Sequence, residues 1–132
     1  MKATLFTDGA ARGNPGPAAS GAVLLSPEGT VLAEVGHYLG TATNNVAEWN
    51  ALCIGLEAAL ERGVRDLSIR MDSELVVKQV LGEYRVKHVA LQPLHRRAIA
   101  LLRKLDRFDI EHVPRAQNKL ADKLANRVLD EQ

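Results

Sequence analysis

The spacing of apolar residues changes partway along the chain, and this change limits the possible folds more than any other feature. Residues 2–7, about 20–26 and about 30–38 are rich in β-forming residues and are separated by turn sequences, which predicts three consecutive strands. We expect a loop from Gly9 to Ala18, where glycines and prolines are frequent. From residue 46 to residue 62 the apolar residues recur at intervals of three and four, which predicts a long helix.

Strand and helix patterns alternate in the rest of the chain. Leu67, Ile69 and Met71 alternate with polar residues, which predicts a half-buried strand that ends at Asp72. The remaining elements are expected to be helices at about 73–81, 92–105 and 119–129 and a strand at 107–113. The order βββαβααβα, with five strands, favours an α/β fold in which helices flank a mixed sheet.

Length and composition narrow the class of protein. The 132 residues fit one domain. Since no stretch approaches the roughly 18 apolar residues of a membrane helix, and the first residues leave no room for a secretory signal, we expect a soluble, cytoplasmic protein. The only cysteine, Cys53, cannot form an internal disulfide and is expected to be a buried thiol. A monomer is the default expectation.

Charge is unevenly divided along the chain. Residues 1–66 hold 4 Lys and Arg against 7 Asp and Glu, a net charge of −3, and residues 67–132 hold 13 against 9, a net charge of +4. A surface that binds a polyanion would therefore lie mainly in the second half. An ordinary mixed surface explains the same numbers equally well, so charge alone does not indicate the function.

Four carboxylates, Asp8, Glu48, Asp72 and Asp122, lie at ends of predicted elements. Each of them has a structural explanation: Asp8 with Gly9 could be a simple turn, Glu48 with Asn45 resembles a capping box, Asp72 could cap the next helix, and Asp122 lies in the first turn of the last helix. Asp8 and Asp72, however, are each expected to end a strand. If those strands are parallel neighbours, both carboxylates emerge at the same edge of the sheet, where a layered α/β fold could bring all four together.

Clustered carboxylates have a chemical use. Their oxygens are the ligands that hard divalent ions prefer, and two such ions about 3.5–4 Å apart can activate water and stabilise the leaving oxygen in phosphodiester cleavage. Without cations the acids would repel one another, so a cluster is most plausible where cations neutralise it.

The sequence resembles the type 1 ribonucleases H in four motifs, which occur in the order and spacing of that family and cover nearly the whole chain. The motifs are Phe6-Thr7-Asp8-Gly9 followed by Gly13-Asn14-Pro15-Gly16-Pro17, then Thr43-Asn44-Asn45 with Glu48, then Met71-Asp72-Ser73, and finally Asn118 with Asp122 and Ala125. The resemblance implies the ribonuclease H-like fold and a single ribonuclease H domain over residues 1–132.

The same resemblance implies an activity. The chain would be an endoribonuclease that hydrolyses the RNA strand of RNA–DNA hybrids and leaves 5′-phosphate and 3′-hydroxyl ends. Asp8, Glu48, Asp72 and Asp122 would be the catalytic ligands of two Mg²⁺ or Mn²⁺ ions, with Asp8 bridging both and Glu48 also touching a ribose hydroxyl.

Substrate contacts follow from the resemblance as well. Asn14, Asn44 and Asn45 match residues that contact 2′-hydroxyls and bases in the minor groove of the hybrid, and Thr43 matches a contact to a phosphate of the DNA strand. Amides suit this task because they both donate to and accept from the 2′-hydroxyl, which distinguishes RNA from DNA. Turn formation and helix capping remain open as explanations for Asn14, Asn44 and Asn45.

The chain departs from many family members in two places. The long basic insertion with tryptophans between the second and third helices is reduced here to residues 82–93, where Arg85, Lys87 and His88 could replace part of its phosphate grip or could simply be exposed. The histidine that precedes the last helix in well-studied members is absent, and Arg115 is the nearest candidate to bind phosphate there. No histidine of this chain is assigned a catalytic role.

Three other functions are compatible with parts of the pattern. A non-catalytic module that binds hybrids should lack at least one of the acids. A related polynucleotidyl transferase that cuts DNA would share the acids but would not need Asn14 and Asn44. A structural protein whose acids only cap helices would require the ordered motifs to be coincidental.

Overall fold

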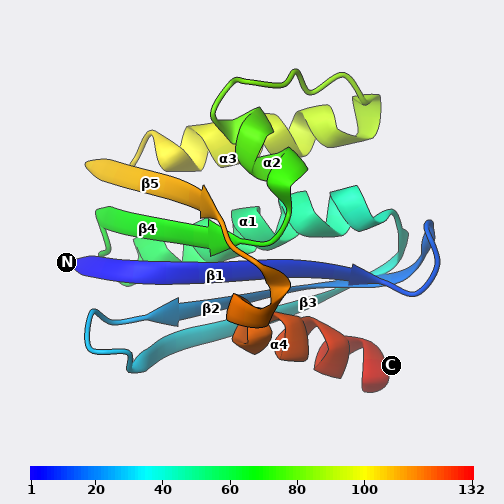
Figure 1. The fold of residues 1–132 in the computed structure, drawn as a ribbon, viewed down its shortest axis with the longest axis horizontal. Helices are drawn as coiled ribbons and strands as arrows, with labels where there is room; N and C mark the ends of the chain where they lie inside the picture. The colour runs from blue at the N-terminus through cyan, green and yellow to red at the C-terminus, as the bar shows by residue number, and fades with distance from the viewer.

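The computed structural model describes residues 1–132 and contains one five-stranded sheet with helices on both faces (Figure 1). The strands are β1 (Lys2–Ala11), β2 (Gly16–Leu25), β3 (Val31–Ala42), β4 (Asp66–Met71) and β5 (Arg107–His112). The helices are α1 (Asn44–Glu61), α2 (Glu74–Val80), α3 (Gln92–Leu102) and α4 (Lys119–Asp130), with short 3₁₀ turns η1 (Val89–Leu91) and η2 (Arg115–Gln117). The predicted order βββαβααβα is confirmed.

The sheet is mixed, and its strand order is β3-β2-β1-β4-β5. Strands β1, β2 and β3 form the predicted antiparallel meander, whereas β4 pairs parallel with β1 on one side and with β5 on the other. The condition set by the sequence is therefore met: β1 and β4 are parallel neighbours, so groups that follow their last pair, Thr7 with Met71, emerge at the same place.

The first hairpin differs from the sequence prediction. Residues 9–18 are not one loop: β1 continues to Ala11 and β2 begins at Gly16, so Asp8 lies within β1 and does not end it. The reason is that β1 loses its parallel partner after Thr7 but keeps its antiparallel partner β2 up to the pair of Ala11 with Ala18. That pairing satisfies backbone groups that a loop would leave to water. The third strand is also longer than predicted, because it pairs with β2 as far as Ala42.

Two glycines let helices approach the sheet closely from opposite faces. A Cβ atom on Gly9 would lie 2.4 Å from the backbone N of Glu48 in α1, and one on Gly21 would lie 2.8 Å from the carbonyl oxygen of Ala121 in α4. Gly21 pairs with Asp8 across the sheet, so both residues face α4. The absence of a side chain at these two positions therefore brings α1 and α4 against the middle of β1 and β2.

The apolar core lies between the sheet and the helices α1 and α3. The buried side chains of the central strands alternate, as Leu67, Ile69 and Met71 do in β4, and pack with Trp49 and Leu52 of α1. Cys53 is buried in the same core, as predicted, and burial raises the pKa of its thiol to about 11. None of the helices has the length and apolar content that crossing a bilayer requires.

Candidate metal centre

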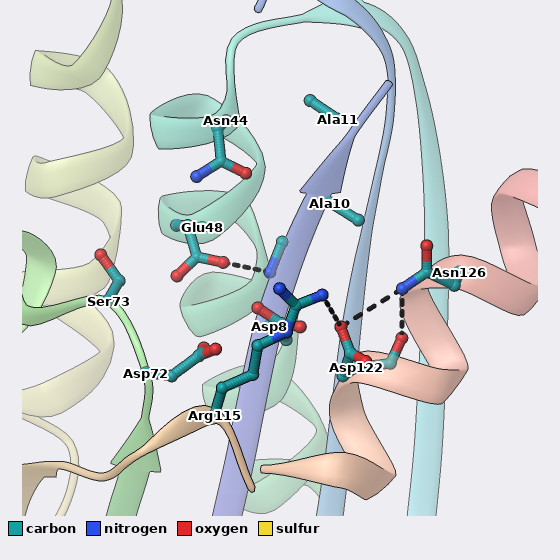
Figure 2. A pocket seen from close by; sticks show the side chains of 11 residues that line it. Asp8, Ala10, Ala11, Asn44, Glu48, Asp72, Ser73, Arg115, Asp122 and Asn126 are labelled. Carbon is teal, nitrogen blue, oxygen red and sulfur yellow. Dashed lines mark hydrogen bonds and ion pairs between the residues drawn. The ribbon is translucent and has the colours of Figure 1, made fainter. Parts of the chain in front are cut away.

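A polar pocket with a volume of about 360 Å³ lies over the middle of β1 (Figure 2). Elements from the whole length of the chain contribute to its wall. The lining residues are Asp8, Gly9, Ala10, Ala11, Asn44, Glu48, Asp72, Ser73, Arg115, Asp122 and Asn126. All four acids singled out in the sequence are among them.

Three of these acids form a compact group. Carboxylate oxygens of Asp8, Glu48 and Asp72 all lie within 4.8 Å of one another, although the residues come from β1, from α1 and from the residue after β4. Asp122 lies outside this group but lines the same pocket from the first turn of α4. The site is thus one close trio with a fourth acid at its side.

Glu48 is oriented by the sheet and does not form a capping box. It is 3% exposed, and its Oε1 accepts a hydrogen bond from the backbone N of Gly9. The N-cap of α1 is Thr43, whose Oγ1 accepts from the backbone N of Val46 at 3.2 Å. The capping explanation for Glu48 and Asn45 is therefore wrong, and Glu48 is turned toward the other acids.

The capping explanation fails for Asp72 as well. Ser73 is the N-cap of α2, and its Oγ accepts from the backbone N of Val76 at 3.3 Å. Asp72 instead accepts a hydrogen bond from Nδ2 of Asn118 at 3.1 Å. Its carboxylate is consequently free to face the pocket.

Asp122 does lie in the first turn of its helix, as expected, and has two neighbours that act on its side chain. Nδ2 of Asn126 donates to its carbonyl oxygen at 2.9 Å and to its Oδ1 at 3.2 Å. Nη2 of Arg115 lies 3.6 Å from the same Oδ1, and the Arg115 side chain is 78% exposed. Arg115 is therefore an exposed cation at the pocket rim, where it forms an ion pair with Asp122.

The innermost carboxyls lie in an electrostatically unfavourable place. Burial, together with the neighbouring charges of Glu48 and Asp72, raises the pKa of Asp8 far above its ordinary value. Burial also raises the pKa of Glu48, although the hydrogen bond from Gly9 works in the opposite direction. No lysine or arginine forms an ion pair with either residue.

A bound divalent cation would offset the electrostatic repulsion among these buried carboxylates. The available donors are carboxylate oxygens from several elements, which are the ligands that Mg²⁺, Mn²⁺ and Ca²⁺ prefer. The cluster could therefore bind a metal ion, and its residues fit a hard cation better than they fit zinc, which favours nitrogen and sulfur.

The predicted substrate residues of the first hairpin and of α1 lie at or near the pocket. Asn44 lines the pocket, and Oδ1 of Asn14 accepts from its backbone N at 3.0 Å, which ties the first hairpin to the start of α1. Thr43 caps α1, and the exposed Asn45 lies in the first turn of α1 without lining the pocket. The structure thus groups Asn14 with Asn44, and the contacts of these residues with substrate stay predictions.

Four residues at the pocket had no role assigned from the sequence. Gly9, Ser73 and Asn126 line the pocket, and Asn118 lies behind it. Gly9, Ser73 and Asn118 had been noted only as members of motifs, and Asn126 had not been noted. Ser73 could have been predicted as a pocket residue, because it lies between the end of a strand and the start of a helix. Nothing in the sequence indicates Asn126, because its role depends on the face of α4 that meets the sheet.

The short connection between α2 and α3 is exposed. Its basic residues Arg85, Lys87 and His88 all lie at the surface. The buried Gln79 holds this segment, because its Nε2 donates to the carbonyl oxygen of Arg85 at 3.2 Å and its Oε1 accepts from Nε1 of Trp49 at 3.1 Å. The connection is therefore anchored to the core while its charges face solvent.

Comparison with known proteins places the chain among ribonucleases H. Residues 6–128 match the family model described as reverse transcriptase-like. The chain is 49% identical over 126 residues to the ribonuclease HI of Halobacterium salinarum, an alignment that covers 96% of this chain and 63% of that protein. It is 47% identical to the bifunctional protein Rv2228c of Mycobacterium tuberculosis, of which it spans 36%. The chain thus covers less than two thirds of these two relatives.

Solved structures agree with this placement. The crystal structure of ribonuclease H1 from Halobacterium salinarum superposes with a TM-score of 0.96 at 47% identity and covers 100% of both chains. LC11-ribonuclease H1, crystallised in complex with an RNA/DNA hybrid, superposes with a TM-score of 0.92 at 37% identity and covers 98% of this chain and 97% of that one. The connection between α2 and α3 spans residues 81–91 and leaves no room for the long basic insertion. The chain belongs to the type 1 ribonuclease H family, in the compact form without that insertion.

Proposed function

We propose that this protein is an endoribonuclease that hydrolyses the RNA strand of RNA–DNA hybrids with two divalent cations, Mg²⁺ or Mn²⁺. The observation that carries the proposal is the meeting of Asp8, Glu48 and Asp72 within 4.8 Å of one another, with Asp122 in the same pocket. The relatives named ribonuclease H and the related structure in complex with an RNA/DNA hybrid support the choice of substrate.

The acids have distinct places in the proposed mechanism. Asp8, Glu48, Asp72 and Asp122 come from β1, α1, the residue after β4 and α4, and together they would hold the two ions. Bound cations would activate a water for in-line attack and stabilise the leaving oxygen, which leaves 5′-phosphate and 3′-hydroxyl ends. The hydrogen bond from Gly9 keeps Glu48 aimed into the pocket, where it would also reach a ribose hydroxyl.

Recognition of the RNA strand would fall to the amides at the rim. Asn14 and Asn44 are already joined by a hydrogen bond at 3.0 Å, so they would present their remaining donors and acceptors to the minor groove together. Asn45 would extend the same contacts, and Thr43 would reach a phosphate of the DNA strand. The exposed guanidinium of Arg115 would bind a phosphate of the RNA strand at the metal centre.

The alternative function within the same fold is a non-catalytic module that binds hybrids. The presence of all four acids in one pocket favours catalysis, because an uncompensated carboxylate cluster has no use in a module that only binds a polyanion. A related enzyme that cuts DNA would have no use for the paired amides Asn14 and Asn44.

One assay tests the proposal against these alternatives. Labelled RNA–DNA hybrid, double-stranded RNA and duplex DNA are incubated with the whole chain in Mg²⁺, in Mn²⁺ or in chelator. We expect cleavage of the RNA strand in the hybrid, with either metal and not with chelator, and 5′-phosphate ends by end-group analysis. Binding of the hybrid without cleavage in both metals would establish the non-catalytic module, and cleavage of duplex DNA would establish the other enzyme class.

The remaining proposals concern the whole molecule. We infer that residues 1–132 act as one ribonuclease H domain, as a monomer and in the cytoplasm. Size-exclusion chromatography with light scattering tests the monomer, since a dimer would have twice the mass of 14.4 kDa.

A further inference from the structure

Asn118 has contacts that its place at the start of a helix does not explain. It occupies the N-cap position of α4, yet its side chain makes no capping hydrogen bond. The residue is buried, with 0% exposure, although asparagine ordinarily lies at the surface. Buried amides are found where they hydrogen-bond to other buried polar groups.

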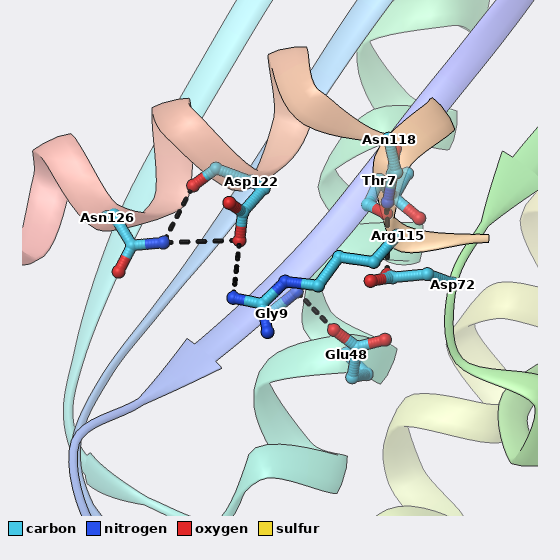
Figure 3. A network of polar contacts seen from close by, with 8 residues as sticks. All are labelled: Thr7, Gly9, Glu48, Asp72, Arg115, Asn118, Asp122 and Asn126. Atoms are coloured by element: carbon cyan, nitrogen blue, oxygen red, sulfur yellow. Dashed lines mark hydrogen bonds and ion pairs between the residues drawn. The ribbon is translucent and has the colours of Figure 1, made fainter.

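The hydrogen bonds of Asn118 join the elements that carry the acids (Figure 3). Nδ2 donates to the carbonyl oxygen of Thr7 at 2.8 Å and to Oδ1 of Asp72 at 3.1 Å. The carbonyl oxygen of Asn118 in turn accepts from the backbone N of Asp122 at 3.1 Å. One residue thus holds β1 beside Asp8, the end of β4 and the first turn of α4.

The neighbours fix which way the Asn118 amide points. Both groups in front of Nδ2, the carbonyl of Thr7 and the carboxylate of Asp72, are hydrogen-bond acceptors. Turning the amide over would set Oδ1 against two oxygens. In the observed orientation Oδ1 is buried without a partner, so this position uses the two donors of the amide and not its acceptor.

We propose that Asn118 is a positioning residue of the metal centre, which holds Asp72 in place through an uncharged donor. The inference rests on the proposed function, because it takes Asp72 to be a metal ligand. A lysine or arginine at this position could also hold the carboxylate, but its charge would compete with the cation. An amide orients the ligand and leaves its negative charge available, and such outer partners commonly set metal affinity.

Metal binding without nucleic acid is the first test. Mn²⁺ is titrated into the whole chain by calorimetry for wild type, Asn118→Ala and Asn118→Asp. Loss of the donors is expected to weaken Mn²⁺ binding by roughly 10–100-fold. Asn50→Ala is the matched control, because Asn50 is a buried asparagine whose Nδ2 donates to Ser20 and contacts His37, away from the pocket. Mn²⁺ affinity equal to wild type in folded Asn118 variants would overturn the proposal.

Two further readouts separate positioning from general stability. In an Asp72→Ala background, Asn118→Ala should weaken Mn²⁺ binding little further, since both changes remove the same interaction. In the cleavage assay the Asn118 variants should need more Mn²⁺ for half-maximal rate, with KM for hybrid unchanged at saturating metal. If Asn118→Ala weakened Mn²⁺ binding equally in wild type and in Asp72→Ala, Asn118 would not act through Asp72.

Wild-type protein provides a test if the variants do not fold. In ¹⁵N-labelled chain, the Asn118 side-chain amide hydrogens should exchange slowly with solvent and should shift when Mg²⁺ is added. Fast exchange, or no shift at saturating Mg²⁺, would overturn the proposal. These measurements need no hydrolysis, so a chain whose Mn²⁺ affinity depends on Asn118 but which leaves hybrid intact would refute the proposed function alone.

Discussion

At the scale of single residues, Asp8 is set apart by deep burial without a cationic partner. It is 5% exposed, it pairs with Gly21 in the sheet, and the acids nearest to it raise its pKa further. Arg115, the only basic residue that lines the pocket, lies 3.6 Å from Asp122 instead. The metal-free protein therefore carries an electrostatic cost at Asp8 that a bound cation would remove.

Replacing Asp8 by Asn should separate stability from activity. Without metal, Asp8→Asn is expected to stabilise the fold at about pH 8 by roughly 1–3 kcal/mol, because folded wild type must keep this buried acid protonated at a pH where the unfolded chain ionises it, while hybrid cleavage is lost. The acid's pKa is raised on folding, so its cost is absent below the unfolded pKa of about 4 and grows as pH rises. The advantage of the variant should therefore increase with pH.

Urea unfolding in chelator across this pH range measures the effect. Adding Mn²⁺ should stabilise wild type and not Asp8→Asn, which reverses their order. A variant less stable than wild type at high pH in chelator, or one that cleaves hybrid at a near-normal rate, would contradict the prediction.

Arg115 offers a second prediction at this scale. Its guanidinium is exposed at the pocket rim, so Arg115→Ala should leave stability unchanged and lower kcat/KM for hybrid by roughly tenfold, or about 1.4 kcal/mol. Arg115→Lys should retain part of the rate, because the charge remains but the fork geometry is lost. Unchanged turnover in Arg115→Ala would remove Arg115 from the proposed site.

At the scale of elements, the sequence predicted most strands and helices because their patterns are local. The alternation in residues 67–71 located β4, and the spacing of Trp49, Leu52 and Leu56 located α1. The extension of β1 past Asp8 was missed because it depends on pairing with β2 and not on local propensity.

The acids of the site could be predicted from the sequence, but the hydrogen bonds that hold them could not. Its four acids were expected from motifs, and their meeting in one pocket agrees with that expectation, although their roles are untested. Asn118 was visible as a motif residue, but its bond to Asp72 spans 46 residues of sequence and follows only from the packing of α4. The periodicity of a sequence predicts helices and strands, but it does not predict the long-range hydrogen-bond partner of a buried amide.

The close packing of α4 on β2 gives a prediction at this scale. In Gly21→Ala, the new Cβ would meet backbone atoms of Ala121 at 2.8 Å and Ala125 at 2.9 Å, which cannot rotate away. The helix must shift, so we expect a loss of about 1–3 kcal/mol in stability and reduced cleavage as Asp122 moves with it.

A matched control exists on the next strand. Gly36 also lies under α4, but a Cβ there would meet Cγ2 of the Val128 side chain at 2.5 Å, and a side chain can adjust. Gly36→Ala should cost less stability and keep its activity. Thermal unfolding and cleavage rates of the two variants compare the effects directly, and equal losses would show that helix position is not what Gly21 controls.

At the scale of the whole molecule, binding of hybrid should depend strongly on salt. The connection after α2 offers only Arg85, Lys87 and His88 as exposed basic residues in place of a long basic insertion. Binding through phosphates releases counterions, so affinity should fall at least about tenfold between about 50 and 200 mM salt. Fluorescence anisotropy with labelled hybrid and Ca²⁺ measures this. Affinity that stays flat over this range would show that phosphate contacts contribute little.

The bond from Asn118 to Thr7 joins residues 111 positions apart and has a consequence for biosynthesis. A ribosome that has translated β1, α1 and β4 has made three of the acids, but α4 is still missing. The nascent chain therefore lacks both the fourth carboxylate and the amide that steadies Asp72. The acidic pocket is therefore complete only after α4 has been made and has packed on the sheet.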